Sequence, residues 1–211
     1  MDPYTTPLLT AREAARHLCM PESTLDSWIA EAVGDPLVHA VRPERRGWPR
    51  MPFVAIVEAY VLRALRDLGM PMPDIRRAVD LVRSEFDDPY GLATERIASD
   101  GVGVFVRVAD ESIVHARDGQ VAIREVIAAH LRYISWDSQG KPTRLQLPQY
   151  PTAAPVIIDP RFSWGAPVLA SSKVPVEAMV SSWRTGESMS AIAEEFELSQ
   201  RTVEDVLRQA A

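Results

Sequence analysis

Proline constrains how this chain can fold more than any other residue type, because a helix tolerates it in the first turn but not in the interior. The 211 residues include 17 prolines and only 10 glycines. Several prolines stand directly before runs of helical spacing or between such runs. We therefore expect short helices joined at proline-containing turns, grouped in small modules rather than around one long core.

Composition and charge exclude several classes of protein. The chain is 46% hydrophobic with a net charge of −6, which is typical of a globular protein and not of one that coats nucleic acid through its overall field. It has no run of about 18 apolar residues and does not start like a signal peptide. Its single cysteine, Cys19, excludes a disulfide framework. We expect a cytoplasmic protein without membrane contact.

The positions of the prolines and the changes in the spacing of apolar residues divide the chain into three segments. We predict a mainly α protein with a winged helix-turn-helix DNA-binding domain over 1–86. A small α+β unit is predicted over 87–150. A second helix-turn-helix domain is predicted over 151–211, after a linker that contains three prolines.

The first segment has the pattern of a helix-turn-helix. Thr10 and Glu13 are spaced as a capping box, and alanines at helical spacing follow them. After a turn, Ser23 is the expected cap of a second short helix. Apolar residues at helical spacing predict two longer helices, one from about Pro52 and one over 72–86.

Polar residues of the second helix and a basic loop are the candidate contacts to DNA. In a helix-turn-helix the second helix presents its first polar side chains to base edges. Residues 40–50 carry four arginines against one acid, a local net charge of +3, and are expected to form a wing. Asp26 would repel a phosphate or accept a hydrogen bond from a cytosine. The candidate DNA-binding residues are Thr10, Ser23, Thr24, Ser27, Arg42, Arg45, Arg46 and Arg50.

In the middle segment, apolar residues recur at every second position instead of at helical spacing. Alternating valines predict a strand over 102–108, and Asp118-Gly119 predicts a hairpin between strands 112–116 and 120–123. A helix over 124–132 and a strand pair over 133–137 and 144–147 complete this unit.

The last segment combines a short strand at 156–160 with three helices. The helices are expected after Pro175, after Gly186 and from Ser199, with Ser188 and Ser199 as the caps of the last two. Gln200, Arg201 and Thr202 would either read DNA or dock a partner. The segment has a net charge of −3, which favours dimerisation or partner docking.

Both ends of the chain resemble known families. Residues 46–53 and 68–75, with the helix pair before them, resemble the DNA-binding head of MerR-like regulators. Residues 156–210 resemble DUF433 domains, through Asp159-Pro160, Gly165-Ala166-Pro167-Val168 and Leu198-Ser199. This domain order resembles VapB-type antitoxins. The resemblance implies a protein that binds double-stranded operator DNA, represses its own operon and neutralises a cognate PIN-domain ribonuclease toxin.

The sequence contains no pattern typical of an enzyme. The four histidines lack metal-ligand spacing, and Cys19 has no motif around it and is expected to be a small buried residue. We expect no catalytic residues, no metal and no cofactor, and we expect a homodimer. The alternatives are a protein-interaction adaptor without DNA binding and a stand-alone MerR-like regulator.

Overall fold

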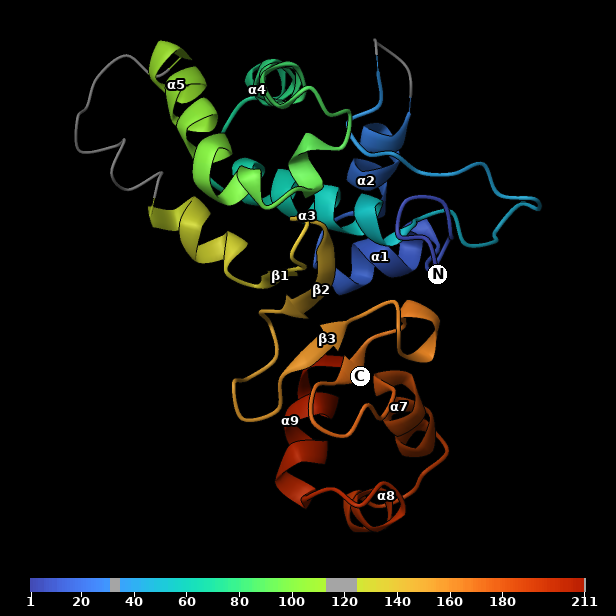
Figure 1. Cartoon of the computed structure of the whole chain (residues 1–211). Coiled ribbons are helices and arrows are strands. Elements are labelled where there is room, and N and C mark those ends of the chain that lie inside the picture. Colours follow the sequence, from blue (N-terminus) through green and yellow to red (C-terminus); the bar gives the residue numbers. More distant parts are fainter. Residues whose placement is uncertain (31–34, 113–124, 211) are drawn as a thin grey trace. The chain divides into compact units, whose positions relative to one another are not determined.

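The computed structural model describes residues 1–30, 35–112 and 125–210, and helix is the main element (Figure 1). These residues form two compact units, a first unit over Asp2–Thr143 and a second unit over Arg144–Ala211. The predicted domain boundaries at residues 86 and 150 stay a prediction. No helix in these three stretches is long and apolar enough to cross a membrane.

Helix α3 (Phe53–Asp67) is the centre of the first unit. Every residue from Phe53 to Leu62 is buried. Around it lie three further helices, α1 (Ala11–His17), α2 (Glu22–Ile29) and α4 (Met72–Phe86). The apolar periodicity predicted these helices, and α4 has the predicted bounds.

Helix α5 (Val102–Ser112) stands where the sequence predicted a strand, so that prediction was wrong. A 3-10 turn (Gly91–Ala93) and a π-helical turn (Ile97–Gly101) lead into it. The buried positions are 101, 102, 104, 105, 106 and 108, of which 101, 104, 105 and 108 recur at helical spacing, and α5 packs against α4. Tertiary packing thus overrides the strand propensity of the alternating valines.

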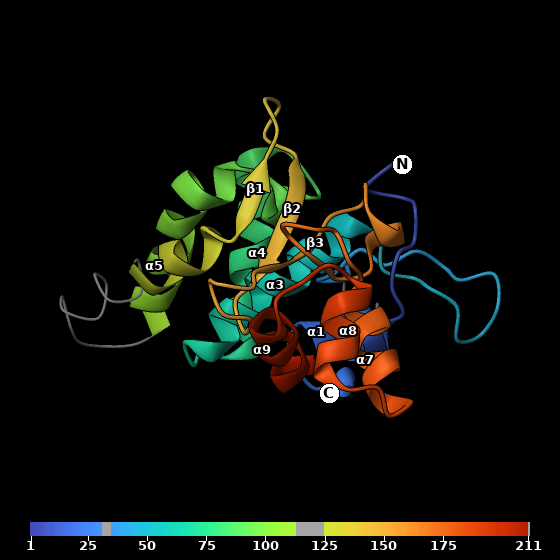
Figure 2. The same ribbon diagram turned by 90° about the horizontal axis from the view of Figure 1, so that it is seen from below.

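A β-hairpin spans the residues at which the first unit ends and the second unit begins. A helix over 125–131 precedes β1 (Ile134–Trp136), and β2 (Pro142–Leu147) follows a turn, so the predicted helix and strand pair are confirmed (Figure 2). The Asp137 carboxylate accepts the backbone N–H groups of Gln139 and Lys141, at 2.8 and 2.9 Å. These hydrogen bonds hold the pKa of Asp137 below its usual value. The predicted hairpin over 112–123 lies almost wholly outside the described residues.

The second unit contains strands β3 and β4 and three helices that pack on one another. The strand order is β1-β2-β3-β4, with β3 (Val156–Ile158) antiparallel to β2 and to β4 (Val168–Leu169). In the register, Leu145 lies opposite Ile158 and Val156 lies opposite Leu169. The helices are α7 (Val176–Arg184), α8 (Met189–Glu195) and α9 (Gln200–Ala210).

The expected serine caps of α8 and α9 are confirmed. The Ser188 hydroxyl accepts the N–H of Ala191 at 3.2 Å, and the Ser199 hydroxyl accepts the N–H of Thr202 at 3.1 Å. Each bond satisfies one of the backbone donors that a helix start leaves free.

Candidate nucleic-acid interface

A capping box starts α1. The Thr10 hydroxyl accepts the N–H of Glu13 at 3.2 Å, and the Glu13 carboxylate accepts the N–H of Thr10 at 2.8 Å. The buried face of α1 consists of Ala11, Ala14 and Ala15. These small side chains let α2 approach closely, so the two short helices form one packed pair.

The turn between α1 and α2 differs from expectation in two ways. Cys19 is exposed rather than buried, because it stands in the left-handed region with φ 49° and leaves the helix. Ser23 is the second residue of α2 and does not cap it; the N-cap position is Pro21, whose fixed φ lets the helix begin earlier. Arg63 of α3 donates to the Leu18 carbonyl, which holds the end of α1.

Helix α2 has one buried and one exposed face. Leu25 and Trp28 are buried, and so is Thr24, whose hydroxyl accepts a hydrogen bond from Arg66 of α3 at 2.8 Å. Ser23 and Ser27 are exposed. Only two of the three predicted contacts on this helix therefore face outward, while Thr24 joins α2 to α3.

The exposed face of α2 is acidic at its start. Glu22 accepts a hydrogen bond from Arg12 at 3.1 Å, which pairs its charge with α1. Asp26 is exposed between Ser23 and Ser27. Cations for phosphate contacts must therefore come mainly from outside α2.

A ten-residue loop, 41–50, supplies those cations. The Val41 N–H donates to the Arg50 carbonyl at 2.9 Å, which closes the loop at its base. The N–H groups of Arg50 and Met51 bond to the Leu9 carbonyl, both at 2.9 Å, and tie the base to the segment before α1. Both views show the loop extending away from α2 and α3 (Figures 1 and 2).

The loop arginines differ in their surroundings. Arg42, Arg45 and Arg46 are exposed, and the Arg45 guanidinium lies 5.2 Å from the centre of the Trp48 ring. Arg50 is half-buried, and its Nε is buried without a hydrogen-bond partner. The loop reverses direction at a turn that contains Gly47, whose φ is 85°. Residues 41–50 form no strand, so the predicted wing stays a prediction.

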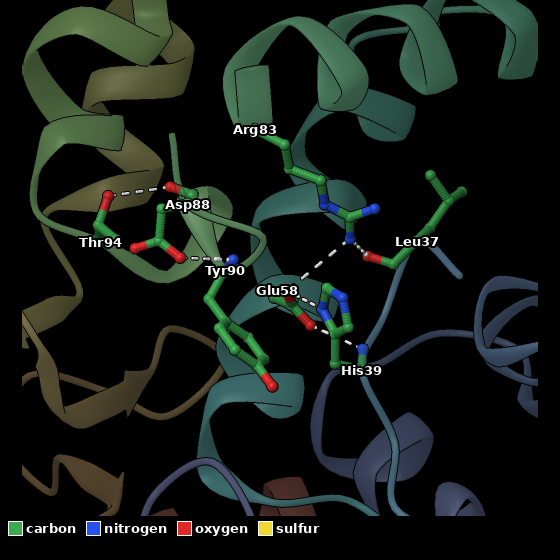
Figure 3. A network of polar contacts seen from close by, with 8 residues as sticks. Leu37, His39, Glu58, Arg83, Asp88, Tyr90 and Thr94 are labelled. Carbon is green, nitrogen blue, oxygen red and sulfur yellow. Dashed lines mark hydrogen bonds and ion pairs between the residues drawn. The ribbon is translucent and has the colours of Figure 1, made fainter. Parts of the chain in front are cut away.

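A buried charged network anchors the segment that leads into this loop (Figure 3). The fully buried Glu58 carboxylate accepts hydrogen bonds from the His39 backbone N–H at 2.8 Å and contacts His39 Nδ1 at 2.7 Å. Arg83 of α4 lies 4.0 Å from the same carboxylate and donates to the Leu37 carbonyl at 3.2 Å. The network thus joins α3 and α4 to residues 37–39.

The sequence interpretation missed this network and Arg12. Glu58 is the one charged residue within the buried run 53–62, and that was the available indication of a paired buried acid. Its partners are far away in the sequence, so no local pattern could identify them.

The predicted residues of the second unit lie at the start of α9. Gln200 and Arg201 are exposed, and the Thr202 hydroxyl lies 2.8 Å from that of Ser199. Two acids follow on the same helix, the exposed Glu204, which pairs with Arg208, and the half-buried Asp205. The role of this helix start stays a prediction.

Two family models match separate parts of this chain. A family model described as "Putative DNA-binding HTH domain" matches residues 7–79, and one described as "Protein of unknown function (DUF433)" matches residues 156–210. The chain is 32% identical to the Mycobacterium tuberculosis protein named "Putative antitoxin VapB45", over 97% of this chain and 94% of that protein. The chain belongs to the VapB family of antitoxins.

The structure of this VapB chain is similar along its whole length to the crystal structure of Rv2018 from Mycobacterium tuberculosis. The TM-score is 0.80 and the sequence identity is 33%. The similarity covers 98% of this chain and all of the other, at 100%. The α1–α2 pair is therefore part of a DNA-binding helix-turn-helix domain, and the chain is antitoxin-like.

Among residues 1–30, 35–112 and 125–210, no group of three or more His, Cys, Asp or Glu side chains could hold a metal ion.

Proposed function

We propose that this chain binds the operator of its own operon and represses it. The observation that carries the proposal is the cluster of three exposed arginines on loop 41–50, whose base is tied to the start of the helix-turn-helix. In the bound state Ser23 and Ser27 lie against base edges in a major groove. Arg42, Arg45 and Arg46 contact phosphates or the minor groove.

The second part of the proposal is neutralisation of a cognate PIN-domain ribonuclease by direct binding. It is supported by the name of the M. tuberculosis relative, which is similar over almost the whole chain. The second unit is acidic overall, which suits a protein partner better than a second DNA contact.

The DNA-binding proposal is tested by fluorescence anisotropy with a duplex from the region upstream of the chain's own gene and with a scrambled duplex. Binding at least tenfold tighter to the upstream duplex is the expected result. Equal or no binding at low salt would refute operator recognition and support an adaptor, the alternative that Glu22 and Asp26 on the exposed face of α2 favour.

The toxin-binding proposal needs a separate measurement. Co-expression with the proposed PIN-domain ribonuclease partner should give a complex that co-purifies and has no ribonuclease activity. A ribonuclease that stays active and separate would contradict this part and leave DNA binding standing.

A further inference from the structure

Trp48 lies at the tip of loop 41–50 with its ring partly in solvent. It is 47% exposed, although burying a tryptophan removes a large apolar area from water. The exposed Arg45 and Arg46 precede it in the same loop. The tip therefore combines one apolar ring with two cations, in a loop of net charge +3 on a chain of net charge −6.

A tight turn sets the position of this ring. The Trp48 N–H donates to the Arg45 carbonyl at 3.1 Å, which closes a turn of four residues. Gly47 occupies the third position of the turn with φ 85°, a left-handed conformation that favours glycine. Pro49 follows directly and restricts the backbone of Trp48. A restrained tip loses less entropy on binding than a free one.

A cation–π contact joins the ring to one of the two arginines. The Arg45 guanidinium lies over the Trp48 ring, 5.2 Å from its centre. Because Arg45 covers one face of the indole, the other face and the edge are left for a ligand. The pair thus offers an apolar surface and a positive charge side by side.

The minor groove of DNA has the matching chemistry. Its walls are deoxyriboses, which present apolar carbons, and its rims are anionic phosphates. The DNA-binding helix-turn-helix domain, residues 7–79, includes this loop. The N–H groups of Arg50 and Met51 bond to the Leu9 carbonyl and hold the loop base beside α1. Charge and position therefore both favour a duplex as the partner of this tip.

We propose that Trp48 is the apolar DNA contact of loop 41–50. Its indole lies against deoxyriboses in the minor groove, while Arg45 and Arg46 contact the flanking phosphates. The inference rests on the proposed DNA binding and adds a second type of contact to it. Arginine–phosphate contacts release counterions and weaken with salt, whereas an apolar contact with sugars releases none. Trp48 therefore contributes affinity that salt does not remove, and it contributes equally on every sequence.

The test compares Trp48→Ala and Trp48→Phe with the unmodified full chain. Trp183→Ala is the control, because Trp183 is 40% exposed on α7 in the second unit. Fluorescence anisotropy with the upstream and the scrambled duplex is measured between about 50 and 200 mM salt. Trp48→Ala should weaken binding to both duplexes about tenfold, by the same factor at every salt concentration. Trp48→Phe should lose under about threefold, since its ring remains apolar, and Trp183→Ala should bind like the unmodified chain.

Quenching of tryptophan fluorescence by acrylamide tests the contact directly. The duplex should protect the unmodified chain from quenching, because it covers the exposed indole. Trp48→Phe should still bind the duplex but lose this protection. Protection that persists in Trp48→Phe would show that the duplex covers another tryptophan, and would overturn the inference.

Three affinity results would also overturn the inference, and they are distinguishable. Unchanged affinity of Trp48→Ala would remove Trp48 from the interface and leave the DNA-binding proposal intact. A loss accompanied by a salt slope lower by about 0.9 would mean that Trp48 only positions Arg45. No binding of either duplex by the unmodified chain would refute the DNA-binding proposal and the inference together.

Discussion

Glu58 joins three segments of the first unit through one buried carboxylate. Its carboxylate lies 2.7 Å from His39 Nδ1 and 4.0 Å from the Arg83 guanidinium. We predict that Glu58→Ala lowers the free energy of unfolding by about 3 kcal/mol, because it leaves the Arg83 charge unpaired where it is mostly buried. Urea denaturation measures this. Glu85→Ala is the control, because Glu85 pairs with Arg107 at the surface and should cost under about 1 kcal/mol. If Glu58→Ala and Glu85→Ala lowered the free energy of unfolding equally, burial would not explain the contribution of Glu58.

His17 is one of two histidines that make stability depend on pH, because burial also lowers the pKa of His130 to about 4. His17 is half-buried rather than on the helix surface, and burial, with a smaller contribution from Arg16, lowers its pKa to about 4. The unfolded chain, with a histidine pKa of about 6.5, therefore binds more protons between pH 4 and 6.5, so stability falls as the pH drops through this window. His17→Gln should reduce the slope of the free energy of unfolding against pH by up to about 1.4 kcal/mol per pH unit. Urea denaturation at several pH values measures this slope. If the unmodified chain and His17→Gln showed the same dependence of unfolding free energy on pH, the lowered pKa of His17 would be disproved.

At the scale of elements, loop 41–50 should determine the salt dependence of DNA binding. Each phosphate contact contributes about 0.9 to the slope of log affinity against log salt. Replacing both Arg45 and Arg46 with Ala should weaken binding to all sequences and flatten this slope by roughly two. The control replaces Arg184 and Arg208, which are exposed in the second unit and should leave the slope unchanged. An unchanged slope in the loop variant would refute the wing assignment.

Helix α5 offers a second test at this scale. Gly103 lies within it, and a Cβ added there would meet nothing within 4 Å. Gly103→Ala should raise the free energy of unfolding by about 0.5–1 kcal/mol, because alanine favours the helix and restricts the unfolded chain. Thermal denaturation measures the gain. A loss of stability would contradict the helical assignment and the open space at this position.

For the whole molecule we predict a homodimer, since paired heads would match two half-sites of an operator. Light scattering without DNA should give about 47 kDa, twice the chain mass of 23.4 kDa. A mass of one chain would contradict the prediction.

The interpretation of the sequence succeeded where the structure depends on local pattern. The capping box of Thr10 and Glu13, the bounds of α4 and the serine caps of α8 and α9 all follow from residues within one or two helical turns. It failed for α5, because alternating valines are compatible with a strand until α4 packs on one side of them. The sequence interpretation also counted Thr24 as a DNA contact, although Arg66, 42 residues further on, donates a hydrogen bond to the Thr24 hydroxyl.

The sequence by itself therefore determined a proline-divided chain of short helices, with one basic segment in the first unit and an acidic tail. Periodicity and capping are local properties, and charge can be counted without coordinates. Only the tertiary structure decided that Glu58 anchors the segment before the loop and that Thr24 bonds to α3 and does not face outward. The physical reason is that burial and pairing depend on residues distant in sequence, which meet only when the chain is packed.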